Sequence, residues 1–195
     1  MRIVLVGPSG TGKTTLATEL GKKHNIPFIS ASAKNLFNCY GFKDHNDIVK
    51  CGINEPKKGF DFQMELMLTR LDLFKQHKNF ISDRSPIDVW VYFLLQNSSQ
   101  LNSSQCEQIE YLYKEGMQLI DKVIFLPHTK EIETEQDNVR ITNPFFQYTV
   151  SSVFERVLED LKNNSRDWSN NMWRTTERNF ERKLEIVNLW LNINS

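Results

Sequence analysis

The stretch RIVLVGPSGTGKT, residues 2–14, decides the fold of this chain. Its opening run is apolar after the first arginine and shows no polar alternation, which is typical of a strand buried on both faces of a parallel sheet. The glycines that follow are Gly7, Gly10 and Gly12. They permit a tight turn, and residues 13–23 then form an expected helix. A buried strand that passes through such a turn into a helix predicts an α/β fold.

Further apolar runs of strand length occur along the chain, at residues 26–30, 79–82 and 122–127, with a weaker one at 170–176. Segments with helical periodicity lie between and after them, at residues 60–74, from Pro86, at 106–119, from Asn143 and at 177–191. This alternation predicts a doubly wound, mostly parallel five-stranded sheet with helices on both faces. Segments without clear periodicity are predicted to be irregular or connecting loops, at 31–59, 96–105 and 162–171.

Length and composition limit the class of protein. A chain of 195 residues fits one domain, 1–195. Lys and Arg total 24 and equal the 24 Asp and Glu, so no overall field attracts nucleic acid or anionic lipid. No apolar stretch approaches the length of a membrane span, and the glycine-rich opening does not resemble a secretory leader. The expected location is the cytoplasm.

The segment GPSGTGKT, residues 7–14, satisfies the complete pattern G-x-x-x-x-G-K-[ST] between a strand and a helix. Its backbone N–H groups can point inward at the positive end of the helix and bind phosphate. Lys13 adds a cation for the β- and γ-phosphates, and the Thr14 hydroxyl is a candidate ligand of Mg²⁺. The pattern predicts ATP and Mg²⁺ as cofactors, with a glycine-rich turn that binds nothing as the alternative. The predicted nucleotide-binding residues are Gly7, Ser9, Gly10, Thr11, Gly12, Lys13, Thr14 and Thr15.

Asp83 and Arg84 directly follow the apolar run at 79–82. Because ligands gather at the carboxyl ends of parallel strands, Asp83 is expected near the phosphate-binding turn. It is the best candidate for the carboxylate that holds Mg²⁺, so Thr14 and Asp83 are the predicted metal ligands. Arg84 is expected to neutralise a phosphoryl oxygen. The alternative is a surface ion pair of Asp83 and Arg84 that caps the next helix.

Three further segments resemble those of known kinases. FISDRSPIDVWVYFLL, residues 80–95, resembles the D/E-R-S and D-R-Y segments of deoxynucleoside kinases, thymidylate kinases and ribosylnicotinamide-kinase-type P-loop proteins. GFDFQMELMLTRL, residues 59–71, resembles the preceding helix of deoxynucleoside kinases, and DNVRITNPFFQ, residues 137–147, is similar to the lid of a small bacterial and phage AAA-type ATPase and kinase group. The resemblance implies one P-loop kinase domain with an acceptor-binding segment at about 31–75 and a short lid at about 128–143.

The resemblance also implies roles for individual residues. Gln63 would offer its amide to the edge of a base, with Phe60 or Phe62 stacking nearby, whereas the sequence alone also allows a solvated Gln63. Arg70 would hold an acceptor phosphate, or is an ordinary exposed arginine of a helix. Arg140 would be the mobile cation of the lid, or lies in a surface loop without a catalytic role.

The second predicted strand departs from the deoxynucleoside kinase pattern. Those kinases carry a catalytic acid at its end, whereas FISASAKN, residues 28–35, offers only serine hydroxyls. A hydroxyl acceptor needs a base, while a phosphate acceptor is already ionised. Either Asp83 doubles as the base, or the acceptor is a monophosphate, which Arg70 and Arg84 favour.

The implied function is an ATP- and Mg²⁺-dependent phosphotransferase for a nucleoside monophosphate or nucleoside, with deoxypyrimidines favoured. The implied catalytic residues are Lys13, Asp83, Arg84 and Arg140. The partner would be the small-molecule acceptor, and a homodimer is compatible with the resemblance. One alternative is a kinase of hydroxymethylated pyrimidines in DNA, which the zero net charge disfavours. Another is an ATPase or switch without a small acceptor, disfavoured because the chain lacks an N-K-x-D signature and an apolar strand ending in Asp-Glu.

Overall fold

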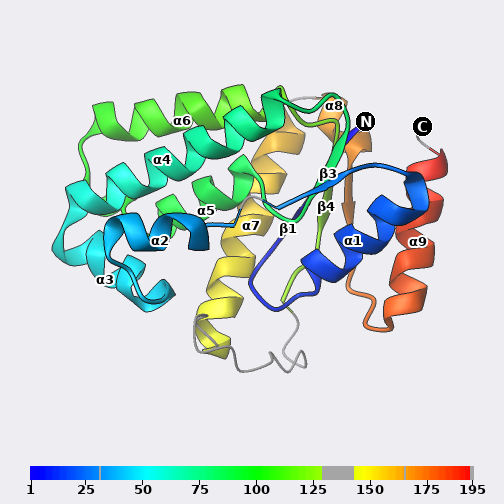
Figure 1. Cartoon of the computed structure of the whole chain (residues 1–195), viewed down its shortest axis with the longest axis horizontal. Helices are drawn as coiled ribbons and strands as arrows, with labels where there is room; N and C mark the ends of the chain where they lie inside the picture. The colour runs from blue at the N-terminus through cyan, green and yellow to red at the C-terminus, as the bar shows by residue number, and fades with distance from the viewer. Residues whose placement is uncertain (31, 129–142, 165, 194–195) are drawn as a thin grey trace.

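The computed structural model describes residues 1–30, 32–128, 143–164 and 166–193. Its centre is a sheet with helices on both sides (Figure 1). The strands are β1 Arg2–Val6, β2 Phe28–Ile29, β3 Phe80–Ser82, β4 Lys122–Phe125 and β5 Met172–Arg174. The helices are α1 Lys13–His24, α2 Lys34–Tyr40, α3 His45–Asn54, α4 Pro56–Lys75, α5 Pro86–Gln96, α6 Ser103–Met117, α7 Pro144–Asn164, α8 Arg166–Asn171 and α9 Phe180–Ile193, with a 3₁₀ turn, η1, at Ser98–Gln100.

The five strands lie in the order β2-β3-β1-β4-β5, and every pair is parallel. The predicted doubly wound α/β fold is therefore confirmed. β1 lies at the centre, with β3 on one side and β4 on the other, which makes its carboxyl end the switch point where such sheets bind ligands. In the register, Val4 pairs with Ser82, and Val6 pairs with Phe125. The turn after β1 therefore lies at the same edge as the residues that follow β3 and β4.

Alternate residues of the central strands pack against opposite faces of the sheet. On one face Ile3 and Leu5 contact α1 and α9, which lie on one side of the sheet in Figure 1. On the other face Val4 and Val6 belong to a larger core formed with α4, α5, α6 and α7. Since both faces are covered, a strand needs apolar residues at every position, which explains why β1 shows no alternation.

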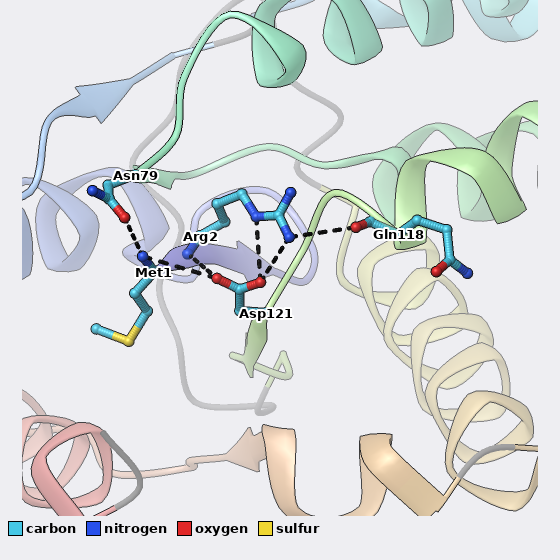
Figure 2. Close-up of polar contacts among 5 residues, drawn as sticks. All are labelled: Met1, Arg2, Asn79, Gln118 and Asp121. Atoms are coloured by element: carbon cyan, nitrogen blue, oxygen red, sulfur yellow. Dashed lines mark hydrogen bonds and ion pairs between the residues drawn. The ribbon is translucent and has the colours of Figure 1, made fainter.

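A cluster of polar contacts, drawn in Figure 2, joins the strands at their amino ends. The Arg2 guanidinium donates to Asp121 Oδ1 from Nη2 at 2.9 Å, and the Arg2 backbone N–H donates to Asp121 Oδ2 at 2.7 Å. The Met1 amino group binds Asn79, just before β3. Partial burial by itself raises the pKa of Asp121, but the hydrogen bonds and charge of Arg2 outweigh it and hold that pKa below its usual value. These contacts fasten β1 to β4 and β3.

The prediction that residues 31–59 are irregular is wrong. Beyond Ser32 this segment forms α2 and α3, and α4 begins at Pro56. Asp44 caps α3 by accepting from the backbone N–H groups of Asn46 and Asp47 at 2.7 and 3.1 Å. The two helices α2 and α3 are short, at 7 and 10 residues, and burial of residues such as Phe37 and Ile48 stabilises them.

The two Asn/Ser-rich loops also contain more helix than predicted. α6 begins at Ser103 because Asn102 and Gln105 form a reciprocal capping box. Residues 162–171 contain the end of α7 and the whole of α8. Trp168 packs against the main core there, and this contact outweighs the weak helix propensity of the surrounding residues. The start of α7 is as predicted, since Asn143 accepts from the Phe145 N–H at 2.9 Å.

Residues 129–142 of the expected lid, Arg140 among them, lie outside the described residues. Within the described ranges, no helix has both the length and the apolar character needed to cross a bilayer.

Candidate active site

The turn between β1 and α1 is built from glycines in conformations that other residues rarely adopt. The φ angles of Gly7, Gly10 and Gly12 are 137°, 80° and 84°. A Cβ atom on Gly7 would lie 2.2 Å from the carbonyl oxygen of Leu126, the residue after β4. Gly7 is therefore required for both its dihedral angle and its close approach, and the turn rests directly on the end of β4.

Lys13 lies inside this turn. Its side chain is buried, and Nζ donates to the carbonyl oxygens of Gly7 at 2.7 Å and Pro8 at 2.6 Å. Thr11 Oγ1 also donates to the Pro8 carbonyl, at 3.0 Å. The turn is thus wrapped around an ammonium group that can also bind phosphate oxygens. Its outer side is accessible, since the exposed residues are Gly10, Gly12, Thr14 and Thr15.

Asp83 lies against the start of α1, as expected from the strand order. Thr14 Oγ1 donates to Asp83 Oδ2 at 2.5 Å, and the Asp83 carboxylate is 3% exposed. Within the described part of the chain, Asp83 Oδ1 has no hydrogen-bond partner. A buried carboxylate oxygen without a partner, next to a hydroxyl, provides the hard oxygen ligands that Mg²⁺ prefers. The residues therefore fit the metal, and their role as its ligands stays a prediction.

Asp83 and Arg84 do not cap the next helix. The N-cap of α5 is Ser85, which forms a reciprocal capping box with Asp88, and Pro86 occupies the first turn. Ser85 Oγ donates to Asp88 Oδ2 at 2.8 Å. The alternative of a surface ion pair is therefore wrong: Asp83 is buried, and Arg84 Nη1 donates to the Asp83 backbone carbonyl at 3.1 Å.

A pocket extends from the glycine-rich turn to α4 and α5. It encloses about 520 Å³ when the space of its open mouth is included. Its lining residues are Gly7, Ser9, Ala33, His45, Ile48, Phe62, Gln63, Leu66, Arg70, Arg84, Asp88, Val89, Tyr92 and Gln96. The pocket therefore joins the predicted phosphate turn to the predicted acceptor-binding segment.

Four of the five predicted acceptor residues line this pocket: Phe62, Gln63, Arg70 and Arg84. Phe60 does not line it and instead packs in the main core. Phe62 is almost fully buried within an aromatic cluster, whose other members are Phe37, Tyr40 and Phe42.

Gln63 is not solvated. It is 2% exposed, and its Nε2 donates to Gln96 Oε1 of α5 at 3.3 Å. Its own Oε1 has no partner among the described residues. A buried amide oxygen without a partner is costly to keep, so its position in the pocket favours a ligand that donates to it.

Arg70 is not an exposed helical arginine either. It is 3% exposed, and Nη1 donates to the Ser85 carbonyl at 2.7 Å. Burial lowers the pKa of Arg70 to about 10, and the nearby Asp88 carboxylate acts in the opposite direction. Arg70 is therefore still charged at neutral pH, and part of its hydrogen-bonding capacity holds the start of α5 in place.

A family model described as an AAA domain matches residues 2–175 of the chain. The chain belongs to this AAA domain family. No curated protein matches it in sequence.

Solved kinase structures resemble this AAA domain along its whole length. Deoxyadenosine kinase from M. mycoides, with dCMP and dCDP bound, superposes with a TM-score of 0.73 at 17% identity, covering 100% of both chains. The NadR protein in complex with NR gives 0.68 at 15% identity over 97% of this chain and 50% of that chain. Shikimate kinase from Aquifex aeolicus gives 0.54 at 18% identity over 100% and 98%. The predicted P-loop kinase fold is confirmed.

Sequence reasoning missed several residues that line the pocket of this AAA domain. Asp88, Tyr92 and Gln96 recur at steps of four along α5, a spacing that places them on one face of a helix. Burial raises the pKa of the Tyr92 phenol, although a hydrogen bond with Ser9 acts in the opposite direction. The four-residue spacing was a usable signal. His45 lies in the segment predicted to be irregular, although Asp44 before it is a typical N-cap residue that indicates the start of a helix.

Proposed function

We propose that this protein is an ATP- and Mg²⁺-dependent phosphotransferase whose acceptor is a nucleoside or a nucleoside monophosphate. One observation carries the proposal: a single pocket is lined both by Gly7 and Ser9 of the phosphate-binding turn and by the buried amide of Gln63. A phosphate donor and a small acceptor bound in this arrangement would meet within one partly enclosed space, where positioning and charge neutralisation accelerate phosphoryl transfer.

Each residue near the turn has a proposed part in this chemistry. Lys13 neutralises the β- and γ-phosphates from inside the turn, and Arg84 neutralises the transferred group from the start of α5. Thr14 and Asp83 would hold Mg²⁺, which neutralises charge on the phosphates when bound. Arg140 of the expected lid, at about 128–143, lies outside the described residues and would add a further cation if the kinase resemblance holds for this residue.

The charges in the pocket bear on the acceptor. Arg70 already donates to the Ser85 carbonyl, so it contributes less toward an acceptor phosphate than the sequence suggested. The pocket also contains the buried carboxylate of Asp88, which an anionic acceptor would have to approach. Arg70 lies near Asp88, and Arg84 adds a second cation to the pocket, so these charges do not select between a nucleoside and its monophosphate. We propose an acceptor of deoxypyrimidine type, supported by the structural neighbour crystallised with dCMP and dCDP.

The test is a coupled assay of ADP release with ATP and Mg²⁺. The acceptor panel contains the four deoxynucleosides and their 5′-monophosphates, with shikimate and nicotinamide riboside as acceptors of other chemistry. We expect ADP release to require a deoxynucleoside or its monophosphate, and the Asp83→Asn variant serves as the inactive control. ATP hydrolysis at the same rate with and without every acceptor would instead support the ATPase or switch alternative.

A further inference from the structure

Two glutamine side chains face each other across the pocket, one from α4 and one from α5. Gln63 Nε2 donates to Gln96 Oε1 at 3.3 Å, and both residues line the pocket. Within the described residues this is the one hydrogen bond of the Gln63 amide, because Gln63 Oε1 has no partner there. Among the described residues, no charged or backbone group therefore fixes which end of the Gln63 amide faces Gln96.

An amide has a donor end and an acceptor end of nearly the same shape. If both amides rotate by half a turn, Gln96 Nε2 donates to Gln63 Oε1, and the pair keeps its hydrogen bond. Gln63 then presents an N–H group where it previously presented an oxygen. A single charged partner in place of Gln96 could satisfy only one of these two orientations, because a carboxylate only accepts and an ammonium only donates.

We infer that Gln96 is a positioning residue that supports Gln63 in both orientations, so that the site accepts bases with either an amino or an oxo group on the edge that Gln63 contacts. This inference rests on the proposed function. Cytosine and uracil differ in this way, since cytosine presents an acceptor at N3 beside a donor amino group, and uracil presents a donor at N3 beside an acceptor oxygen. The reversal of donor and acceptor matches the reversal that the glutamine pair allows.

The test compares deoxycytidine with deoxyuridine, and dCMP with dUMP, since the members of each pair have the same sugar and differ only at the edge in question. The measured quantity is the ratio of kcat/KM between the cytosine and uracil acceptors. We expect the wild-type ratio to lie within about tenfold of unity. In Gln96→Glu, residue 96 only accepts, so Gln63 is held with Nε2 toward it and presents Oε1 to the base. Because Oε1 accepts from an amino group, the ratio should rise by about tenfold or more in favour of cytosine.

Two further variants separate orientation from general damage. Gln96→Leu removes the partner without choosing an orientation, so kcat/KM should fall for both bases while their ratio stays near the wild-type value. Gln100→Glu makes the same chemical change as Gln96→Glu at an exposed position beyond the end of α5 and should change neither value. Thermal unfolding of all three variants identifies any that fails to fold.

The outcomes distinguish this inference from the proposed function. A wild-type protein that uses only one of the two bases, or a Gln96→Glu ratio equal to that of Gln100→Glu, overturns the role of Gln96 and leaves the kinase proposal standing. A wild-type protein that phosphorylates none of the four acceptors, nor any other nucleoside or nucleotide, overturns both.

Discussion

Replacing Asp83 by Asn removes a negative charge and leaves the shape of the side chain almost unchanged. In the structure the carboxylate is 3% exposed, one oxygen accepts from Thr14, and the other has no partner within the described residues. Asn retains an acceptor for Thr14 but supplies only a weak ligand for Mg²⁺. We expect kcat to fall by about 10²–10³-fold, the typical loss when one charge-stabilising group is removed from a transition state.

The same substitution should not destabilise the ligand-free protein. A buried polar group without a partner costs about 1–3 kcal/mol, and an uncharged amide is cheaper to bury than a carboxylate. The substitution also removes the attraction between Asp83 and the nearby Arg70 guanidinium, which limits the increase in the free energy of unfolding. We therefore expect an increase of between zero and about 2 kcal/mol in the free energy of unfolding. At about 2–4 °C per kcal/mol for a chain of this size, the Tm should stay constant or rise by a few degrees.

Thermal unfolding with and without Mg²⁺ and ATP measures both effects. Ligand at about 100 times its Kd stabilises a protein by about 2.7 kcal/mol, so the wild-type Tm should rise clearly and that of Asp83→Asn should rise less. Asp121→Asn is the matched control at the other end of the sheet, where the carboxylate is paired with Arg2. It should lower the Tm and leave kcat unchanged. A ligand-free Asp83→Asn protein that unfolds at a much lower temperature, or turns over at the wild-type rate, would refute the reasoning.

Gly7→Ala should prevent ATP binding and lower the Tm, because the Cβ of the alanine would lie 2.2 Å from the Leu126 carbonyl oxygen. Calorimetry measures the binding, and normal binding would show that the turn moves freely away from β4. Lys13→Met retains the apolar stem and loses the ammonium, so kcat should fall by about 10²-fold or more while the circular dichroism spectrum is unchanged. The stability that the Arg2 contacts give Asp121 should be present above its unfolded-state pKa of about 3.9 and lost as the pH falls through its lower folded-state pKa. In urea titrations, the stability difference between wild type and Asp121→Asn should therefore shrink as the pH falls below about 3.9, and a constant difference would contradict this.

The parts of the site that the sequence predicted depend on local backbone geometry. A glycine is required wherever φ is positive or a carbonyl lies too close for a Cβ, so the turn from Gly7 to Gly12 is encoded residue by residue. The position of Asp83 followed from a more general rule, since the ends of parallel strands meet at one edge. Both inferences required no knowledge of which helices pack together.

The parts that the sequence did not predict depend on contacts between distant segments. Gln63 and Gln96 meet only because α4 packs beside α5, and no local pattern reports that contact. His45 reaches the pocket because α3 packs beside α4 and α5, a contact between distant segments of the chain. The burial of Arg70 likewise results from the packing of helices. The sequence alone does not indicate whether a charged residue in a helix is buried or exposed.

The cluster of Arg2, Asn79 and Asp121, drawn in Figure 2, lies at the amino ends of the strands, whereas Lys13 and Asp83 follow their carboxyl ends. The contacts that fasten the strands and the residues proposed to bind phosphate and metal therefore do not touch one another. Directed evolution could raise heat tolerance at the first set with little effect on the second, because substitutions at separated positions without shared partners usually have additive effects.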